Sequence, residues 1–204
     1  MKGILLRGLL LLCLAGLLAG CSTSSGKSNS TGNSNTIIMP PAAGVTMTLD
    51  GQGQYTGFDG MAEKETIEEA AAAGNVVIRD LEVVAGQEAW DQFIEAADSG
   101  INAGLRIAQF FSDEPGSPYY NDLFYQDGKY YLFDNTAKTL VPEPFSYLLT
   151  LRGKTGRPLK DSGMIILTDD NRLTFDRVIA AQYSSSTEVI NSLPPYTLIR
   201  YLVN

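Results

Sequence analysis

The chain has 204 residues, with 15 Lys and Arg against 23 Asp and Glu, a formal net charge of −8 at pH 7, two Cys and no His. The absence of His excludes Ser-His and Cys-His nucleophiles and removes the commonest general base and metal ligand. An excess of acidic groups is repelled by phosphates, and no local cluster of Lys and Arg stands out, so we do not expect nucleic acid as a partner.

The first twenty residues have the pattern of a cleavable export signal. Lys2 and Arg7 are the only charges, and an uncharged apolar stretch follows from Gly8 to Gly20. As a helix, this stretch would cover roughly 20 Å at about 1.5 Å per residue, which is short of the ~30 Å hydrocarbon core of a bilayer. The pattern therefore predicts a signal peptide over residues 1–20 and disfavours a permanent spanning helix.

The apolar stretch ends in Leu18-Ala19-Gly20-Cys21, which resembles the lipobox of bacterial prolipoproteins. The resemblance implies cleavage between Gly20 and Cys21 and a diacylglycerol on the Cys21 thiol. The alternative is an ordinary secretory signal that happens to contain a Cys at its end. We expect a protein attached through Cys21 to the extracytoplasmic face of the cell membrane.

Cysteine usage limits what can hold the mature domain together. Cys13 would be removed with the signal and Cys21 would be lipidated, so we expect neither a disulfide nor a Cys-rich metal site, and no cofactor. A domain of this kind depends on its hydrophobic core.

Composition divides the rest of the chain into three parts. Residues 21–36 are Ser, Thr, Asn and Gly with the lipidation Cys and one Lys, and predict a flexible tether that holds the domain about 20 Å from its anchor. Residues 37–63 contain Pro40-Pro41 and several Gly, and predict an irregular lead-in along the domain surface. Residues 64–204 are expected to form one globular domain.

The first helices of this domain have clear sequence signals. Thr66-Ile67-Glu68-Glu69 matches a capping box, and Gly74 is placed to end the helix. Residues 75–81 predict a strand. Residues 87–99 then place Trp90, Phe93, Ile94 and Ala97 at helical spacing, so we interpret Trp90 and Phe93 as core residues in preference to a ligand-binding stripe.

The remainder alternates in the manner of strands. Asp127-Gly128 predicts a tight hairpin, and the polar segment Gly153-Lys154-Thr155-Gly156-Arg157-Pro158 an open loop between antiparallel strands. Thr174 predicts a helix cap, with Leu173 packed against Val178. The strands are expected at residues 105–111, 119–125, 129–134, 145–152, 164–168 and 196–203. Together these elements predict an α+β fold, mainly an antiparallel sheet with helices packed on it.

Several short motifs carry a family resemblance. They are Gly74-Asn75-Val76-Val77, Trp90 and Phe93, Leu105-Arg106-Ile107-Ala108-Gln109-Phe110-Phe111-Ser112, Glu114, Pro118, Asp122-Leu123, Tyr125-Gln126-Asp127-Gly128-Lys129 and Phe133-Asp134-Asn135-Thr136. They resemble a family of uncharacterised Gram-positive-type bacterial lipoproteins over roughly residues 66–204. The chain departs from the family pattern at Ala137-Lys138, where a basic-acidic pair would follow. Since the family has no assigned activity, the resemblance implies a fold and a location only.

Acidic and hydroxyl side chains offer few catalytic candidates. Asp113-Glu114, in a predicted Pro/Gly loop, could pair with Asp122 or Glu143 for glycoside hydrolysis, although a solvated turn explains the same residues. The segment 168–171 could supply oxygen ligands to Ca²⁺, but a turn before the next helix accounts for it. The run Ser184-Ser185-Ser186 is interpreted as a helix cap, with Ser185 and Glu188 forming the box. We therefore assign no catalytic residue and no metal site.

Tyrosines are the stronger candidates for recognition. In a hairpin, one residue of each pair Tyr119-Tyr120 and Tyr130-Tyr131 faces outward, so two rings are expected to be exposed together, near Glu114. Exposed aromatic side chains are frequent at binding surfaces, although cross-strand tyrosines also stabilise hairpins.

The sequence thus favours a non-enzymatic binding or accessory lipoprotein of the cell envelope, with the membrane and an envelope protein or glycan as partners. The alternatives are a carboxylate-dependent hydrolase of envelope polymers and an inhibitor or scaffold of an envelope enzyme.

Overall fold

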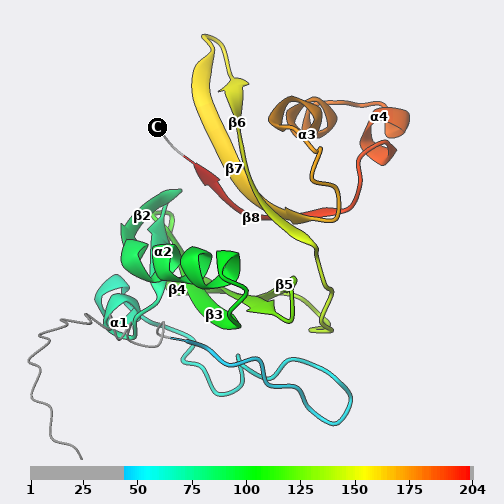
Figure 1. Cartoon of the computed structure of the whole chain (residues 1–204). Coiled ribbons are helices and arrows are strands. Elements are labelled where there is room, and N and C mark those ends of the chain that lie inside the picture. Colours follow the sequence, from blue (N-terminus) through cyan, green and yellow to red (C-terminus); the bar gives the residue numbers. More distant parts are fainter. Residues whose placement is uncertain (1–43, 203–204) are drawn as a thin grey trace, which may run out of the picture. The chain divides into compact units, whose positions relative to one another are not determined.

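The computed structural model describes residues 44–202, and the predicted signal peptide, Cys21 and the tether lie outside this range. The described residues form two β-sheets and four helices, which confirms the predicted α+β class and its mainly antiparallel pairing (Figure 1). In chain order the elements are α1 (Ile67–Ala72), β1 (Val76–Arg79), β2 (Glu82–Ala85), α2 (Gln87–Asp98), β3 (Ala103–Phe111), β4 (Glu114–Gln126), β5 (Lys129–Asp134), β6 (Tyr147–Thr155), β7 (Lys160–Thr168), α3 (Phe175–Gln182), α4 (Thr187–Asn191) and β8 (Tyr196–Leu202).

The first sheet has the strand order β2-β1-β3-β4-β5. Strands β1 and β3 are parallel, with Val76 opposite Ile107, and a parallel pair requires a crossover connection. The hairpin to β2 and the helix α2 provide that connection. Strand β2 was not predicted, because its four residues are too few to show a clear alternation.

Helix α1 begins as its sequence predicts. The Thr66 hydroxyl accepts a hydrogen bond from the Glu69 N–H at 3.1 Å, and the Glu69 carboxylate accepts one from the Thr66 N–H at 2.8 Å. This reciprocal capping box satisfies two donors that the helix cannot pair internally. Gly74, with φ of +82°, follows the last turn and lets the chain reverse into β1.

Helix α2 contributes to the main core, which fills the space between the two sheets. Trp90 and Phe93 are 6% and 0% exposed, as predicted for core residues. They pack with Leu105 and Ile107 of β3 and with other buried residues from β7 and β8. The Arg200 guanidinium of β8 lies 5.2 Å from the centre of the Trp90 ring, so a cation–π contact links the second sheet to α2.

Strand β7 is the centre of the second sheet, whose order is β6-β7-β8. Its last six residues are buried on both faces. Ile165 and Leu167 face the main core, whereas Met164 and Ile166 face α3. Leu173 and Val178 pack in that second cluster, which confirms the predicted contact at the start of α3, where the Thr174 hydroxyl caps the helix.

Two predicted loops are strand in the structure. Glu114 opens β4 opposite Phe111, so the hairpin turn contains only Ser112 and Asp113. Proline and glycine are tolerated there because β5 pairs with β4 only from Asn121 onward, which leaves one side of the strand start free.

The second misread loop is the segment Gly153–Pro158. Strands β6 and β7 continue through it to Thr155 and Lys160, and Lys154 forms an ion pair with Asp161 at 2.8 Å across the hairpin. The open loop is therefore reduced to a turn of residues 156–159. The glycines and the proline in the sequence concealed the strands on either side.

The predicted cap at Ser185 was displaced by one residue. The Ser186 hydroxyl accepts the bond from the Val189 N–H at 3.5 Å and begins α4, which puts Glu188 out of position for a capping box. Three successive serines offer the same local chemistry, so the sequence does not distinguish them.

Replacing Trp90 tests the packing between the sheets. We expect Trp90→Ala to lower the free energy of unfolding by about 3–5 kcal/mol, because a buried indole is lost and a cavity remains. Denaturant unfolding followed by circular dichroism measures this, since Trp90 is the one tryptophan. A loss below about 1 kcal/mol would show that the ring does not support the core.

Candidate functional site

A buried ion pair fixes the outer face of the first sheet. Arg106 of β3 and Asp122 of β4 lie opposite each other, and two guanidinium N–H groups donate to the carboxylate at 2.6 and 2.7 Å. Asp122 is 0% exposed, so its charge depends on these partners. Tyr55 donates its hydroxyl to the same carboxylate at 2.6 Å, and Arg106 also donates to the Gly57 carbonyl at 2.7 Å. Residues 55–57 of the lead-in are thereby attached to the sheet.

Tyr55 occupies the centre of this attachment. Its ring stacks on Phe133 with centroids 4.1 Å apart, and it is only 2% exposed. Burial, together with the hydrogen bond to the Asp122 carboxylate, raises the pKa of Tyr55 above its ordinary value, so the phenol stays protonated and remains a donor. The lead-in is largely irregular from residue 44 to 63, but it covers the sheet with a buried aromatic anchor.

Residues upstream of Tyr55 run across the first residues of β3. Val45 and Met47 are half-buried against the cluster of Tyr55, Phe124 and Phe133. Gly104 makes this approach possible, because a Cβ at that position would lie 2.1 Å from the Val45 carbonyl oxygen. The bare backbone of Gly104 therefore sets the position of residues 44–47.

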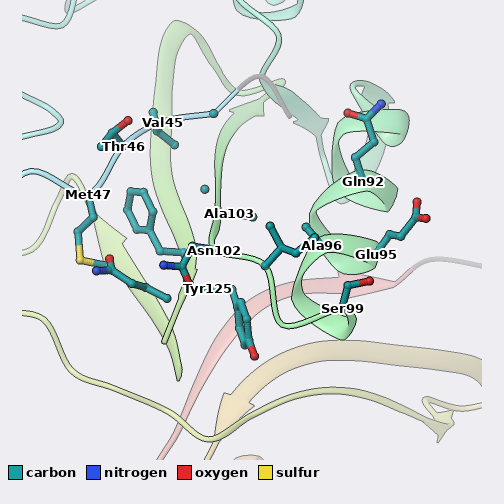
Figure 2. A pocket seen from close by; sticks show the side chains of 15 residues that line it. Val45, Thr46, Met47, Gln92, Glu95, Ala96, Ser99, Asn102, Ala103 and Tyr125 are labelled. Atoms are coloured by element: carbon teal, nitrogen blue, oxygen red, sulfur yellow. The ribbon is translucent and has the colours of Figure 1, made fainter. Parts of the chain in front are cut away.

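A cleft of about 730 Å³ opens between residues 44–47 and the C-terminal half of α2. Figure 2 shows Val45 and Met47 on one side and Gln92 and Glu95 on the other, with Asn102 and Ala103 between them. The cleft lies where β1 does not reach: β1 pairs with β3 only from Ile107, so the first residues of β3 have no strand of the described chain on that side.

The lining of the cleft combines an apolar base with a polar rim. Phe124, Tyr125 and Ala96 contribute apolar surface, and Glu95 and Ser99 contribute a carboxylate and a hydroxyl. Further amide groups come from Gln92, Asn102 and Gln126. A cavity of this volume, with a few polar groups around an apolar base, is typical of small-molecule sites.

A second hollow of about 630 Å³ lies on the other side of α2 and shares Glu95 and Ser99 with the cleft. Asp91 and Asp98 also line it, and Tyr130 and Thr150 face them. Because Asp91, Glu95 and Asp98 are spaced by four and three residues, they lie along one side of the helix. Both hollows therefore carry negative charge from the same helix.

The predicted tyrosine surface is not formed. Tyr120 is 3% exposed and donates its hydroxyl to Glu65, whereas Tyr119, Tyr130 and Tyr131 are half-buried. Tyr119 pairs with Gln109 near the start of β4, and Tyr130 and Tyr131 pair with Tyr125 and Phe124 near its end. The two pairs thus lie at different ends of the hairpin, because the tight turn at Asp127-Gly128 places Tyr130 and Tyr131 opposite Tyr125 and Phe124, several residues from Tyr119 and Tyr120.

Glu114 is brought to Tyr119, whose hydroxyl donates to the carboxylate at 2.6 Å. That bond, with the nearby charge of Glu114, raises the pKa of Tyr119. Asp122, the proposed partner for acid-base chemistry, is instead committed to Arg106 and Tyr55. The carboxylates considered for glycoside hydrolysis are therefore not available as a pair at Glu114 and Asp122.

The other candidate segments are parts of turns. The Asp169 carboxylate accepts two hydrogen bonds from Ser146, and the Asp170 carboxylate accepts from the Arg172 N–H. Within residues 44–202, no group of three or more acidic, Cys or His side chains is arranged to hold a metal ion.

Comparison of the chain with protein-family models, curated proteins and solved structures found no match in any of the three. The resemblance to Gram-positive-type lipoproteins therefore stays a prediction. In residues 44–202 no helix is long and apolar enough to cross a membrane.

Sequence reasoning missed the cleft because its walls come from four separate segments, none of which has an unusual composition. One signal was present: Gly104 directly precedes the predicted strand of residues 105–111, and a glycine in or beside a strand often marks close contact with another backbone. Asn102 and Gln92 carried no sign of their common location.

Substitution of Gly104 tests the cleft wall. We expect Gly104→Ala to lower the free energy of unfolding by about 1–3 kcal/mol, because the added methyl group would displace the Val45 carbonyl. Gly51→Ala is the matched control, since a Cβ at Gly51 meets no atom within 4 Å. Equal denaturation midpoints for the two variants would show that residues 44–47 do not pack on β3.

Proposed function

We propose that the protein is a lipid-anchored binding protein of the bacterial cell envelope, held at the extracytoplasmic face through Cys21, and that the cleft beside α2 is its ligand site. The observation that carries the binding role is the cleft itself: about 730 Å³, with an apolar base and a rim of amide, hydroxyl and carboxylate groups. The lipobox motif supports the anchor.

The chemistry of the cleft favours a glycan fragment that carries amides, such as a disaccharide with a short peptide. Sugar rings pack their apolar faces on aromatic surfaces such as that of Tyr125. Their hydroxyl and amide groups pair with the amides of Gln92 and Asn102, and a peptide amine pairs with Glu95. A non-catalytic role fits this lining, because Glu95 is its only carboxylate and a pair of carboxylates is needed for the usual glycoside hydrolysis.

The anchor is tested by removing the thiol. We expect Cys21→Ser to release the protein from the membrane fraction of a bacterial host after a high-salt wash, because stable attachment needs the paired acyl chains of the modified Cys. The wild-type chain should resist the same wash. A substituted protein that stays in the washed membranes would contradict the anchor.

The binding site is tested by filling it. We expect Ala96→Phe to weaken binding of soluble peptidoglycan fragments by about tenfold or more, because its ring would occupy the cleft beside Glu95. Ala72→Phe is the control, since Ala72 is an exposed helical residue on α1. Calorimetric titration of the full chain measures both.

Equal affinity of the two variants would place the site elsewhere. Failure of the wild-type chain to bind any fragment would refute the proposed ligand class. Release of cleaved products during the titration would instead favour the hydrolase alternative.

A further inference from the structure

The end of the β6–β7 hairpin concentrates positive charge. Arg152 and Lys154 on β6, Arg157 in the turn and Lys160 on β7 are all exposed. They are four of the chain's 15 basic residues, and the only acidic side chain among residues 152–161 is Asp161. The expectation that Lys and Arg form no local cluster is therefore wrong at this site, where four basic side chains fall within nine consecutive residues.

These four cations lie on both faces of the hairpin end and in its turn. Strand β8 pairs with β7 only from Gly163, so within the described chain the end of the hairpin is two-stranded and extends past its neighbour (Figure 1). Alternate residues face opposite sides of a strand, and Lys154 lies opposite Asp161 while Thr155 lies opposite Lys160. Arg152 and Lys154 are therefore on one face and Lys160 on the other, with Arg157 between them.

An apolar side chain lies at the centre of this ring. Leu159 is 68% exposed in the turn, and the adjacent Pro158 is exposed as well. A leucine in this position gains nothing from a soluble polyanion, which would contact the cations and leave the leucine in water. A bilayer surface satisfies both, since phosphate headgroups lie above an apolar layer that a leucine can enter.

We propose that the end of the β6–β7 hairpin docks on anionic phospholipid membranes, with Leu159 in the acyl boundary and Arg152, Lys154, Arg157 and Lys160 among the headgroup phosphates. The charge of the remaining domain orients the contact: helix α2 has four acidic side chains and no basic one, so its face is repelled from the same surface. The inference does not depend on a lipid at Cys21.

The test reads the environment of the hairpin tip directly. In the full chain with Cys13→Ser and Cys21→Ser, a polarity-sensitive dye is attached at Leu159→Cys and, as a control, at Tyr183→Cys, which replaces a side chain 80% exposed after α3. Vesicles contain phosphatidylcholine and phosphatidylglycerol in roughly a two-to-one ratio, or phosphatidylcholine alone. We expect a blue shift at position 159 with anionic vesicles only, and none at position 183.

Charge removal then identifies the cations. Arg157→Gln and Lys160→Gln should each lower the partition constant by about fivefold at moderate salt. Arg79→Gln with Lys138→Gln removes two exposed charges elsewhere and should have little effect. No shift at position 159 would overturn the proposal. Equal shifts at 159 and 183 would also overturn it, as would polyphosphate binding that raises dye anisotropy while vesicles leave the emission unchanged.

Discussion

The buried charge of Asp122 is the constraint on which much of the fold depends. A carboxylate without solvent is tolerated only with full pairing, and its two oxygens need Arg106 from the neighbouring strand and Tyr55 from a segment 67 residues away. Satisfying that charge therefore holds the lead-in against the sheet. The lead-in in turn supplies Val45 and Met47, which form one wall of the cleft. The position of that wall therefore depends on the hydrogen bond between Tyr55 and Asp122.

Local signals predicted the local structure well. The capping box at Thr66, the stripe that includes Trp90 and Phe93, and the cap at Thr174 each involve residues within a few positions of one another, and the structure confirms all three. Strand β2 was not predicted, because its four residues are too few for a clear sequence pattern. Glu114 and Gly153–Pro158 were misread because glycine and proline are common in loops but are also tolerated where a strand has a free side.

Features that depend on contacts between distant residues could not be predicted from the sequence. Nothing near Tyr55 indicated that it would meet Asp122, and nothing near Gln92 or Asn102 indicated a common cavity. The tyrosine surface is not formed for a related reason: alternation assigned one residue of each pair to each face correctly, yet the turn at Asp127-Gly128 pairs Tyr130 and Tyr131 with the end of β4 far from Tyr119 and Tyr120. Facing direction is a property of one strand, whereas proximity depends on the register between strands.

The second sheet has a buried part and an exposed part, which tolerate mutation differently. The part of β7 from Gly163 onward is buried and packs against both the main core and α3, so change there is costly. From Lys154 to Asp161 the end of the hairpin lies outside these core clusters, and most of its side chains are exposed around one cross-strand ion pair. Mutations can therefore accumulate at the tip without loss of stability, and this element can diverge between related chains faster than the scaffold that carries it.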